Sequence, residues 1–508
     1  MKPSQWLLSK RTGDQAYSAA ICQAYLAAML MGFPLYFQNN YINLTAAKKS
    51  YFQTATLVFF ALIFACRIYQ ALAARQQEAR NRQTFHLGLP GFFAFAFFWS
   101  ILFSSILSPA WPESFLGREG RQMGGLFLAL CILAFFAVSY SWQRSAWLPW
   151  LLPLSCALTF GIVICNFYGW DLLGMHQNLA KSQQPTFLGT MGNTNINAGY
   201  GGVMCALLLA LSYMGKQIWL RRFCFAASAF GIYACYGTAS DSWLLAVCGA
   251  LLVILAHSMG DPARMYRWWG CCLAFFLGGA AMMLTMQVEK GLGKETIYME
   301  TLQSQGILQF LTGRGTLLAQ ACLLLLILWG IRTHTALMAF LQRHGNKLLL
   351  LILLAALLLA AFLIFPLPDS FGTNRGYIWK RTLSNFSHLP IWQKLLGYGP
   401  NCFFQSMEAR YGAEMIERYT YPFLDAHNEA LQFLAVTGVF GAASYFGMQL
   451  SLLASCLRRW KQNPVSFFGV IGISAYLLQG LANNPSVFTT PLYFIFLGVI
   501  AKSQFINF

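Results

Sequence analysis

Charged residues are scarce in this 508-residue sequence, at 10% of the total, whereas hydrophobic residues make up 57%. A soluble protein keeps roughly a quarter of its residues charged, so this chain lacks the polar surface to face water on all sides. Long polar segments between the apolar blocks are also absent. The composition therefore excludes a string of soluble domains and predicts a single membrane domain over residues 1–508.

Acidic residues are fewer than basic ones, 16 against 34, which leaves a net charge of +18. Such an excess can indicate nucleic-acid binding, but its distribution argues otherwise. If the N-terminus is cytoplasmic and fourteen helices alternate, 20 of the 34 basic residues but only 3 of the 16 acidic residues lie inside. Basic residues in short loops set the orientation of membrane proteins. We therefore expect both termini in the cytoplasm, membrane lipids as partners and no nucleic acid.

The sequence has 14 cysteines but lacks a CxxC pair or a cluster of cysteine and histidine. Most of these cysteines fall within apolar blocks, where a free thiol behaves as a small hydrophobic group. We therefore predict no structural disulfide, no metal site and no cofactor. The stretch from Tyr17 to Phe37 follows a basic start and lacks a small-residue cleavage site, so it is interpreted as the first span rather than a signal peptide.

Apolar blocks of about twenty residues are what the sequence has in abundance. A bilayer core of roughly 30 Å needs about 20 apolar helical residues. The blocks are continuous rather than alternating, which favours helices over a barrel. We predict an all-α polytopic integral membrane protein with about 12–14 transmembrane helices. The fourteen candidate segments are 16–37, 51–72, 87–107, 123–141, 147–167, 194–215, 223–237, 242–259, 269–287, 315–331, 348–366, 429–456, 465–482 and 490–502.

The outer loops hold most of the polar, glycine-rich and proline-rich sequence. The largest is the extracytoplasmic loop at 367–427, and an amphipathic helix is predicted near 402–418 within it. There, Phe403, Met407, Tyr411 and Met415 recur every four residues, which places one apolar stripe on a helix. Asn401 is a candidate N-cap. Such a helix could lie along the membrane surface, cap a cavity or pack on the bundle.

His427 is the strongest candidate for catalysis, because it ends the largest loop and precedes a predicted helix. An imidazole titrates near neutral pH and can act as a general base. Asp425 and Glu429 are close enough in sequence to orient it or to raise its basicity. The alternative is an interfacial histidine that hydrogen-bonds locally.

The sequence around His427 forms a recognisable pattern: His427-Asn428, nine residues, then Gly438-Val439-Phe440-Gly441. This pattern, placed directly after the largest outer loop, resembles the signature of the O-antigen ligase family and its relatives, the O-oligosaccharyltransferases and polysaccharide polymerases. The resemblance extends over about residues 100–500. Four further segments resemble family elements: GREGRQMGGL (117–126), GTMGNTNINAGY (189–200), NRGYIW (374–379) and LLGYGPNCF (395–403).

The resemblance implies a GT-C-like fold and a metal-independent glycosyltransferase in the bacterial cytoplasmic (inner) membrane, with its active face extracytoplasmic. Such enzymes transfer a glycan from an undecaprenyl-diphosphate carrier to a lipid or protein acceptor. His427 would deprotonate the acceptor hydroxyl. Arginines would stabilise the diphosphate, for which their permanent charge and bidentate geometry are suited.

Arg375 and Arg121 are the predicted catalytic arginines, and Arg118 is a third candidate that would bind substrate. Their alternative role is that of solvated loop charges, or of partners for Glu119 or Asp369. The predicted substrate-binding set also includes four further residues: Asn193, Asn428, Asp425 and Arg314. For Asn193 the alternative is a helix N-cap.

One segment departs from the family pattern. Members often carry Ser-Arg in mid-chain, whereas the corresponding stretch here, GTASDSW (237–243), has Asp241 at the arginine position. Either the correspondence is shifted or the diphosphate clamp lacks one arginine. Arg314 could compensate, or it could be an ordinary interfacial arginine.

Three functions remain open from the sequence. A ligase transfers a finished glycan, and a polymerase joins repeat units; both fit the signature. A transporter or a flippase for lipid-linked glycans is the alternative from another class. Against it stand the lack of an inverted repeat, the few charges within the predicted spans and the clustering of candidate residues on one face.

Overall fold

The computed structural model describes residues 16–74, 88–181, 183–304, 306–336, 338–345, 347 and 368–505. Within these ranges the secondary structure consists of helices and turns, with a single isolated bridge between Phe187 and Asn193 and no strand. Eight helices are long and apolar enough to cross a membrane. The prediction of an all-α polytopic membrane protein is confirmed.

The eight long apolar helices share a length of at least 19 residues. They are Ala16–Leu35, which includes π-helix η1 (Ala28–Gly32) and α2 (Phe33–Leu35), then α3 (Leu44–Ala74), α4 (Gly88–Ile106), α7 (Leu148–Phe167), α8 (Thr194–Met214), α11 (Pro262–Gly291), α14 (Arg314–Thr333) and α19 (Glu429–Leu457). Three shorter apolar helices accompany them: α6 (Gly125–Ser141), α10 (Ser242–Ser258) and α20 (Pro464–Gly480).

Thirteen of the fourteen predicted spans coincide with a helix, and the fourteenth, 348–366, lies outside the described residues. The two shortest predictions correspond to α9 (Ile218–Gly237) and α21 (Thr490–Phe505). Both are packed among other helices: α9 lies against α7, α8 and α11, and α21 lies against α6 and α20.

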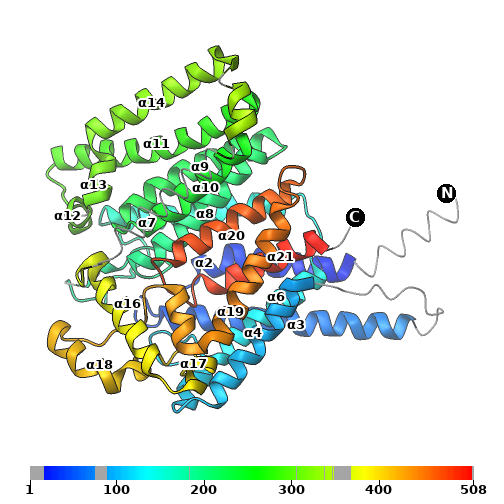
Figure 1. Ribbon diagram of the computed structural model, residues 1–508. Helices are drawn as coiled ribbons and strands as arrows, with labels where there is room; N and C mark the ends of the chain where they lie inside the picture. Colours follow the sequence, from blue (N-terminus) through cyan, green and yellow to red (C-terminus); the bar gives the residue numbers. More distant parts are fainter. Residues whose placement is uncertain are drawn as a thin grey trace.

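The long helices pack roughly side by side, and short helices gather at one end of the bundle (Figure 1). This end holds α16 (Phe371–His388), α17 (Ile391–Leu396) and α18 (Phe403–Tyr419), with α12 (Ile297–Ser304) and α13 (Gly306–Thr312) beside them. Two further short elements among the described residues are α5 (Trp111–Leu116) and the 3₁₀ helix η2 (Gln184–Thr186).

Helix α18 falls in the segment that was predicted to be amphipathic. The apolar stripe at Phe403, Met407, Tyr411 and Met415 is buried, and it forms a separate small core with residues of α16 and α19. Of the alternatives for this helix, the structure shows packing on neighbouring helices. Helices α16 and α18 both contact α19, the helix that begins just after His427.

The prediction that Asn401 caps α18 is wrong. The N-cap position is Cys402, and its side chain makes no capping hydrogen bond. Asn401 adopts a left-handed backbone conformation, and its Oδ1 accepts a hydrogen bond from the backbone N of Met123 at 3.0 Å. The side chain therefore joins the 117–126 segment to the largest outer loop rather than ending a helix.

Candidate active site

Side chains from three separate segments meet around His427. Its Nε2 lies 3.4 Å from Oδ1 of Asp425, a residue whose side chain is only 5% exposed. Asp425 also forms an ion pair with Arg121 and accepts a hydrogen bond from Nδ2 of Asn484. The His427 side chain is 30% exposed, so it can be reached from the surface. We refer to Arg121, Asp425, His427 and Asn484 as the His427 cluster.

Asp425 is held as a carboxylate. Its burial disfavours the charged form, but the attraction of Arg121, followed by that of His427 and the hydrogen bond from Asn484, outweighs the burial. The net result lowers the pKa of Asp425 below its ordinary value of 3.8. A charged Asp425 can therefore accept a hydrogen bond from the His427 imidazole near neutral pH.

His427 is poised in its neutral form. Burial is the largest cause that lowers the pKa of His427 below 6.5; Asp425 opposes the shift, and the positive charges of Arg375 and Arg121 add to it. When Nε2–H donates to Asp425, the unprotonated nitrogen is Nδ1, which lies 3.5 Å from the amide nitrogen of Asn484. A neutral imidazole oriented by a carboxylate has the arrangement that a general base requires.

Arg375 is brought to this cluster by the local fold of α16. Residues 372–374 have positive φ values, so Arg375 begins the regular part of the helix. One turn later, the indole Nε1 of Trp379 donates to the carbonyl of Ala426 at 3.0 Å. This bond ties α16 to the backbone that directly precedes His427. The Arg-x-x-x-Trp spacing therefore places Arg375 one helical turn before Trp379, whose hydrogen bond holds this part of α16 against the backbone next to His427.

Arg375 lies within electrostatic reach of two acidic residues, Asp241 and Asp425. Burial lowers the pKa of Arg375, while the charges of Asp241 and Asp425 oppose that shift. An arginine remains protonated throughout because its ordinary pKa is above 12. Asp241, the residue at the position where the family often has arginine, thus lies within electrostatic reach of the site.

The loop that carries Arg121 is compact. Gly117 has a φ of +91°, and a Cβ at this position would lie 2.9 Å from the backbone of Gln122, so the turn requires glycine. Arg118 points toward α18, with its guanidinium carbon 5.9 Å from the centre of the Phe404 ring. The structure therefore brings Arg121 into the His427 cluster and places Arg118 beside α18 instead.

The two glycine-rich elements of the family pattern contact each other directly. Gly438 interrupts α19 with a φ of +66°, and a Cβ there would lie 2.4 Å from the Leu395 carbonyl. The backbone N atoms of Tyr398 and Gly399 donate to the carbonyls of Ala435 and Val436 at 3.1 and 2.9 Å. The 395–399 segment thus satisfies carbonyl groups that the break in α19 leaves without helical partners.

Helix α4 supports the same junction from the other side. Ser104 Oγ donates to the carbonyl of Val436 at 2.9 Å, and Ser108 Oγ donates to that of Tyr398 at 2.7 Å. A Cβ on Gly441 would meet Ser100 Oγ at 2.9 Å. The glycines of the signature therefore allow close packing that sets the direction of the first part of α19, at whose N-terminal end His427 lies.

Three other predicted residues, Asn428, Asn193 and Arg314, lie at the starts of helices. Asn428 Oδ1 caps α19 by accepting from Leu431 N at 3.0 Å, and Asn193 Oδ1 caps α8 by accepting from Ile196 N at 2.9 Å. Arg314 is the first residue of α14, and within the described part of the chain no ion pair or hydrogen bond joins it to the His427 cluster. The side chains of Asn428 and Asn193 thus cap helices, and Asn193 and Arg314 make no hydrogen bond or ion pair with the cluster in the described part of the chain.

Glu429 does not orient His427. Its side chain is buried, and Oε1 accepts hydrogen bonds from Tyr445 at 2.9 Å and Tyr476 at 3.1 Å. Of the two carboxylates that the sequence places close to His427, the structure brings only Asp425 into contact with it. The reason is helical geometry: Glu429 is the first residue of α19 and points into the bundle, whereas Asp425 lies in the preceding loop.

Asn484 is the member of the cluster that the sequence prediction missed. It lies in the turn between α20 and α21, within the segment Ala482-Asn483-Asn484-Pro485. The sequence offered a usable signal, because two asparagines stand before a proline at the outer end of two predicted helices. Only the fold shows that this turn reaches Asp425. Among the described residues, no group of three or more histidine, cysteine or acidic side chains could hold a metal ion.

Comparison with protein families provides independent evidence. Residues 306–446 match the family described as O-antigen ligase. The match covers less than a third of the chain, and over these residues the sequence is similar to the O-antigen ligase family. The match contains Arg375, His427 and the glycine signature, while Arg121 and Asn484 lie outside it. No curated protein matches the sequence. The family indicates a multi-pass membrane glycosyltransferase of the ligase or polymerase kind, with a lipid-linked glycan and an acceptor as substrates.

Proposed function

We propose that this protein transfers a glycan from an undecaprenyl-diphosphate carrier to an acceptor hydroxyl, in the manner of an O-antigen ligase. The observation that carries the proposal is the His427 cluster. A partly exposed neutral histidine contacts a buried carboxylate, and two arginines lie close to the pair. That combination provides both a base for an alcohol and positive charge for a phosphate leaving group.

In the proposed reaction, Nδ1 of His427 accepts the proton of the acceptor hydroxyl. The acceptor oxygen forms a new bond to the anomeric carbon of the glycan, and the bond between that carbon and the diphosphate oxygen breaks. The diphosphate carrier leaves with the electron pair of the broken bond. Asp425 stabilises the imidazolium ion that forms, because its carboxylate faces Nε2.

Arg375 is proposed to bind the diphosphate. Its guanidinium is half-buried and is flanked by Asp241 and Asp425 at electrostatic distance. Arg121 is already paired with Asp425, so we assign it mainly to holding that carboxylate in place. A diphosphate is a good leaving group, and fixed arginine charge stabilises it without a metal ion, so transfer should persist in the presence of EDTA.

The test is transfer of glycan in a reconstituted system containing an undecaprenyl-diphosphate-linked donor. His427→Ala is expected to lower turnover by about 10²–10⁴-fold, the usual contribution of a general base. The matched control is His388→Ala, since His388 is exposed at the end of α16 and, within the described ranges, hydrogen-bonds to Ser384 and Ser387 of its own helix. Unchanged turnover in folded His427→Ala protein would refute the base assignment.

The same assay distinguishes a ligase from a polymerase. With a donor carrying a single repeat unit and no added acceptor, a polymerase lengthens the carrier-linked glycan, whereas a ligase leaves the donor intact. With a purified lipid or protein acceptor, a ligase transfers the glycan once. The proposal of a ligase fails if repeat units accumulate on the carrier in the absence of an acceptor.

The active face is proposed to be extracytoplasmic. Single cysteines in a cysteine-free background test this orientation by labelling in intact cells. Arg410→Cys on α18 should react with an impermeant reagent from outside, and Arg458→Cys after α19 should react only after permeabilisation. The opposite pattern would reverse the topology inferred from the basic residues.

A further inference from the structure

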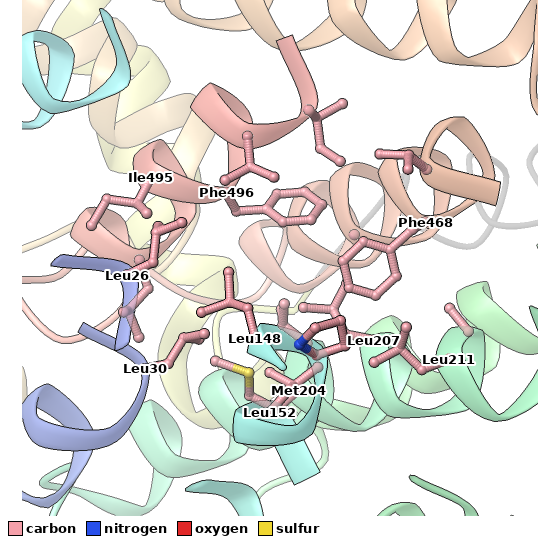
Figure 2. A pocket seen from close by; sticks show the side chains of 18 of the residues that line it. Leu26, Leu30, Leu148, Leu152, Met204, Leu207, Leu211, Phe468, Ile495 and Phe496 are labelled. Carbon is pink, nitrogen blue, oxygen red and sulfur yellow. The ribbon is translucent and has the colours of Figure 1, made fainter. Parts of the chain in front are cut away.

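An apolar cavity of about 690 Å³ lies inside the helix bundle, between the N-terminal helix, α7, α8, α20 and α21. Figure 2 shows its labelled side chains from several elements, among them Leu26, Leu152, Leu207 and Phe496. The volume lies within the range of roughly 300–1,000 Å³ typical of ligand sites. A cavity lined in this way suits an aliphatic chain.

The cavity extends along most of α8, from Gly199 near its first turns to Met214 at its end. Fifteen steps along a helix rise about 22 Å, so the cavity is elongated along α8 rather than round. At the end nearer to the His427 cluster it is lined by polar side chains, including Gln479 and Tyr476. At the opposite end it is lined by Arg144 and Lys216.

The basic end has the features of a headgroup site. Arg144 and Lys216 are exposed, and neither makes an ion pair or hydrogen bond with another described residue. The nearby Trp142 is 7% exposed, and its Nε1–H is buried without a hydrogen-bond partner in the described part of the chain. A buried indole donor needs an acceptor, and a phosphate or ester oxygen at this position would provide one.

The basic end of the cavity and the His427 cluster lie at opposite ends of the helices. The loops at 142–147 and 215–217 lie at the far ends of α6 and α8 from the His427 cluster, on the face to which the basic residues assign the cytoplasm. Anionic lipids in the cytoplasmic leaflet attract basic residues placed at the membrane surface. A donor with its diphosphate at Arg375 would not use these two charges.

We infer that this cavity binds an anionic phospholipid, whose acyl chain lies along α8 and whose phosphate is held by Arg144, Lys216 and the indole of Trp142. The lipid fills the space between α8, α20 and α21. Because Asn484 lies in the turn that joins α20 to α21, the lipid also supports the position of one member of the His427 cluster. The inference concerns a second lipid site and does not depend on the transfer reaction.

The test is native mass spectrometry of the full chain purified in detergent, followed by titration with phosphatidylglycerol or phosphatidylcholine. The wild type is expected to retain phosphatidylglycerol preferentially. The variant with Arg144→Gln and Lys216→Gln is expected to bind it at least about fivefold more weakly, given the contribution of each basic residue at a membrane surface. The matched control carries Arg332→Gln and Arg458→Gln, which remove the same charge from exposed positions outside the cavity.

A second variant tests the apolar part. Val203→Phe places a larger side chain in the cavity and is expected to reduce lipid retention while leaving the charged end intact. Equal binding of both phospholipids, equal loss in the Arg332 and Arg458 control, or full retention in Val203→Phe would each overturn the inference. Retention of a polyprenyl lipid in place of phospholipid would also overturn it, because the occupant would then be the carrier.

Discussion

Two charged networks lie at the same end of the molecule and differ in what surrounds them. On α16 and α18, Asp369 pairs with Lys380 at 2.9 Å and with Arg418 at 3.1 Å, and these side chains are 41–49% exposed. In the His427 cluster, the central carboxylate of Asp425 is 5% exposed. Water screens the first network, whereas the carboxylate at the centre of the second is buried and is screened less, although its partner Arg121 is 40% exposed.

The comparison shows why similar residue types have different roles. The exposed network is composed of carboxylates and cations that neutralise each other. Its effect on Asp369 is to lower the pKa, chiefly through the hydrogen bond from Lys380. The buried network also contains His427, and Arg375 lies close to it. A bound substrate can therefore change the protonation of the histidine and the charge around it. Four predictions test this difference, from the largest expected effect to the smallest.

Asp425→Asn is expected to reduce transfer by about 10²–10⁴-fold, because the amide can neither stabilise the imidazolium nor hold Arg121. The matched substitution in the exposed network, Asp369→Asn, is expected to change transfer by less than about threefold. Turnover of both variants in reconstituted vesicles checks the comparison. Equal effects would show that burial does not distinguish the two networks.

Arg375→Ala is expected to reduce transfer by about 10²–10³-fold, since it removes a charge that faces the leaving group. Arg375→Lys should recover only part of this loss, because lysine lacks the two-pronged donor geometry of arginine. Arg418→Ala is the control in the exposed network. Full recovery with lysine would indicate that charge alone is needed, and the proposed bidentate contact would then be rejected.

The pH profile of transfer is expected to lose activity on the acid side with a midpoint below pH 6.5, because burial lowers the pKa of His427 from that value. Arg375→Gln removes a positive neighbour and should move this midpoint to higher pH. Asp425→Asn removes the group that favours the protonated imidazole and should move it to lower pH. Profiles of the residual activities over pH 4.5–8 measure both shifts, and shifts of the opposite sign would contradict the electrostatic account.

Trp379→Phe is expected to reduce transfer by about tenfold, since it removes the hydrogen bond to Ala426 while keeping an aromatic ring. The substitution tests whether this bond positions α16 relative to His427. The measurement compares two quantities. The kcat should fall, whereas the pH midpoint of the loss of activity on the acid side should not change. A change in the midpoint would instead indicate that Trp379 alters the charge around the histidine.

Much of the candidate site could be predicted because its residues stand in short patterns. His427, Asp425 and Arg375 were found from the loop, the signature and the chemistry of arginine. Arg121 was found from an early glycine-rich loop. Asn484 was not found: Asn483, Asn484 and Pro485 mark a polar turn between two apolar helices, but no local pattern shows that this turn reaches Asp425. Glu429 was assigned to the histidine because it is close in sequence, although the start of α19 turns its side chain inward.

The sequence by itself determined the class of protein, the positions of the described spans and the polar segment that holds the histidine. Those features follow from local hydrophobicity, since about twenty apolar residues must form a helix in a bilayer. Tertiary structure alone decided which carboxylate serves His427, that Asn484 joins it, and that Trp379 rather than Arg375 contacts the neighbouring backbone. Such contacts depend on how separate helices end at one face of the bundle, which no local pattern specifies. The same holds for the apolar cavity, because its lining comes from helices that are far apart in the chain.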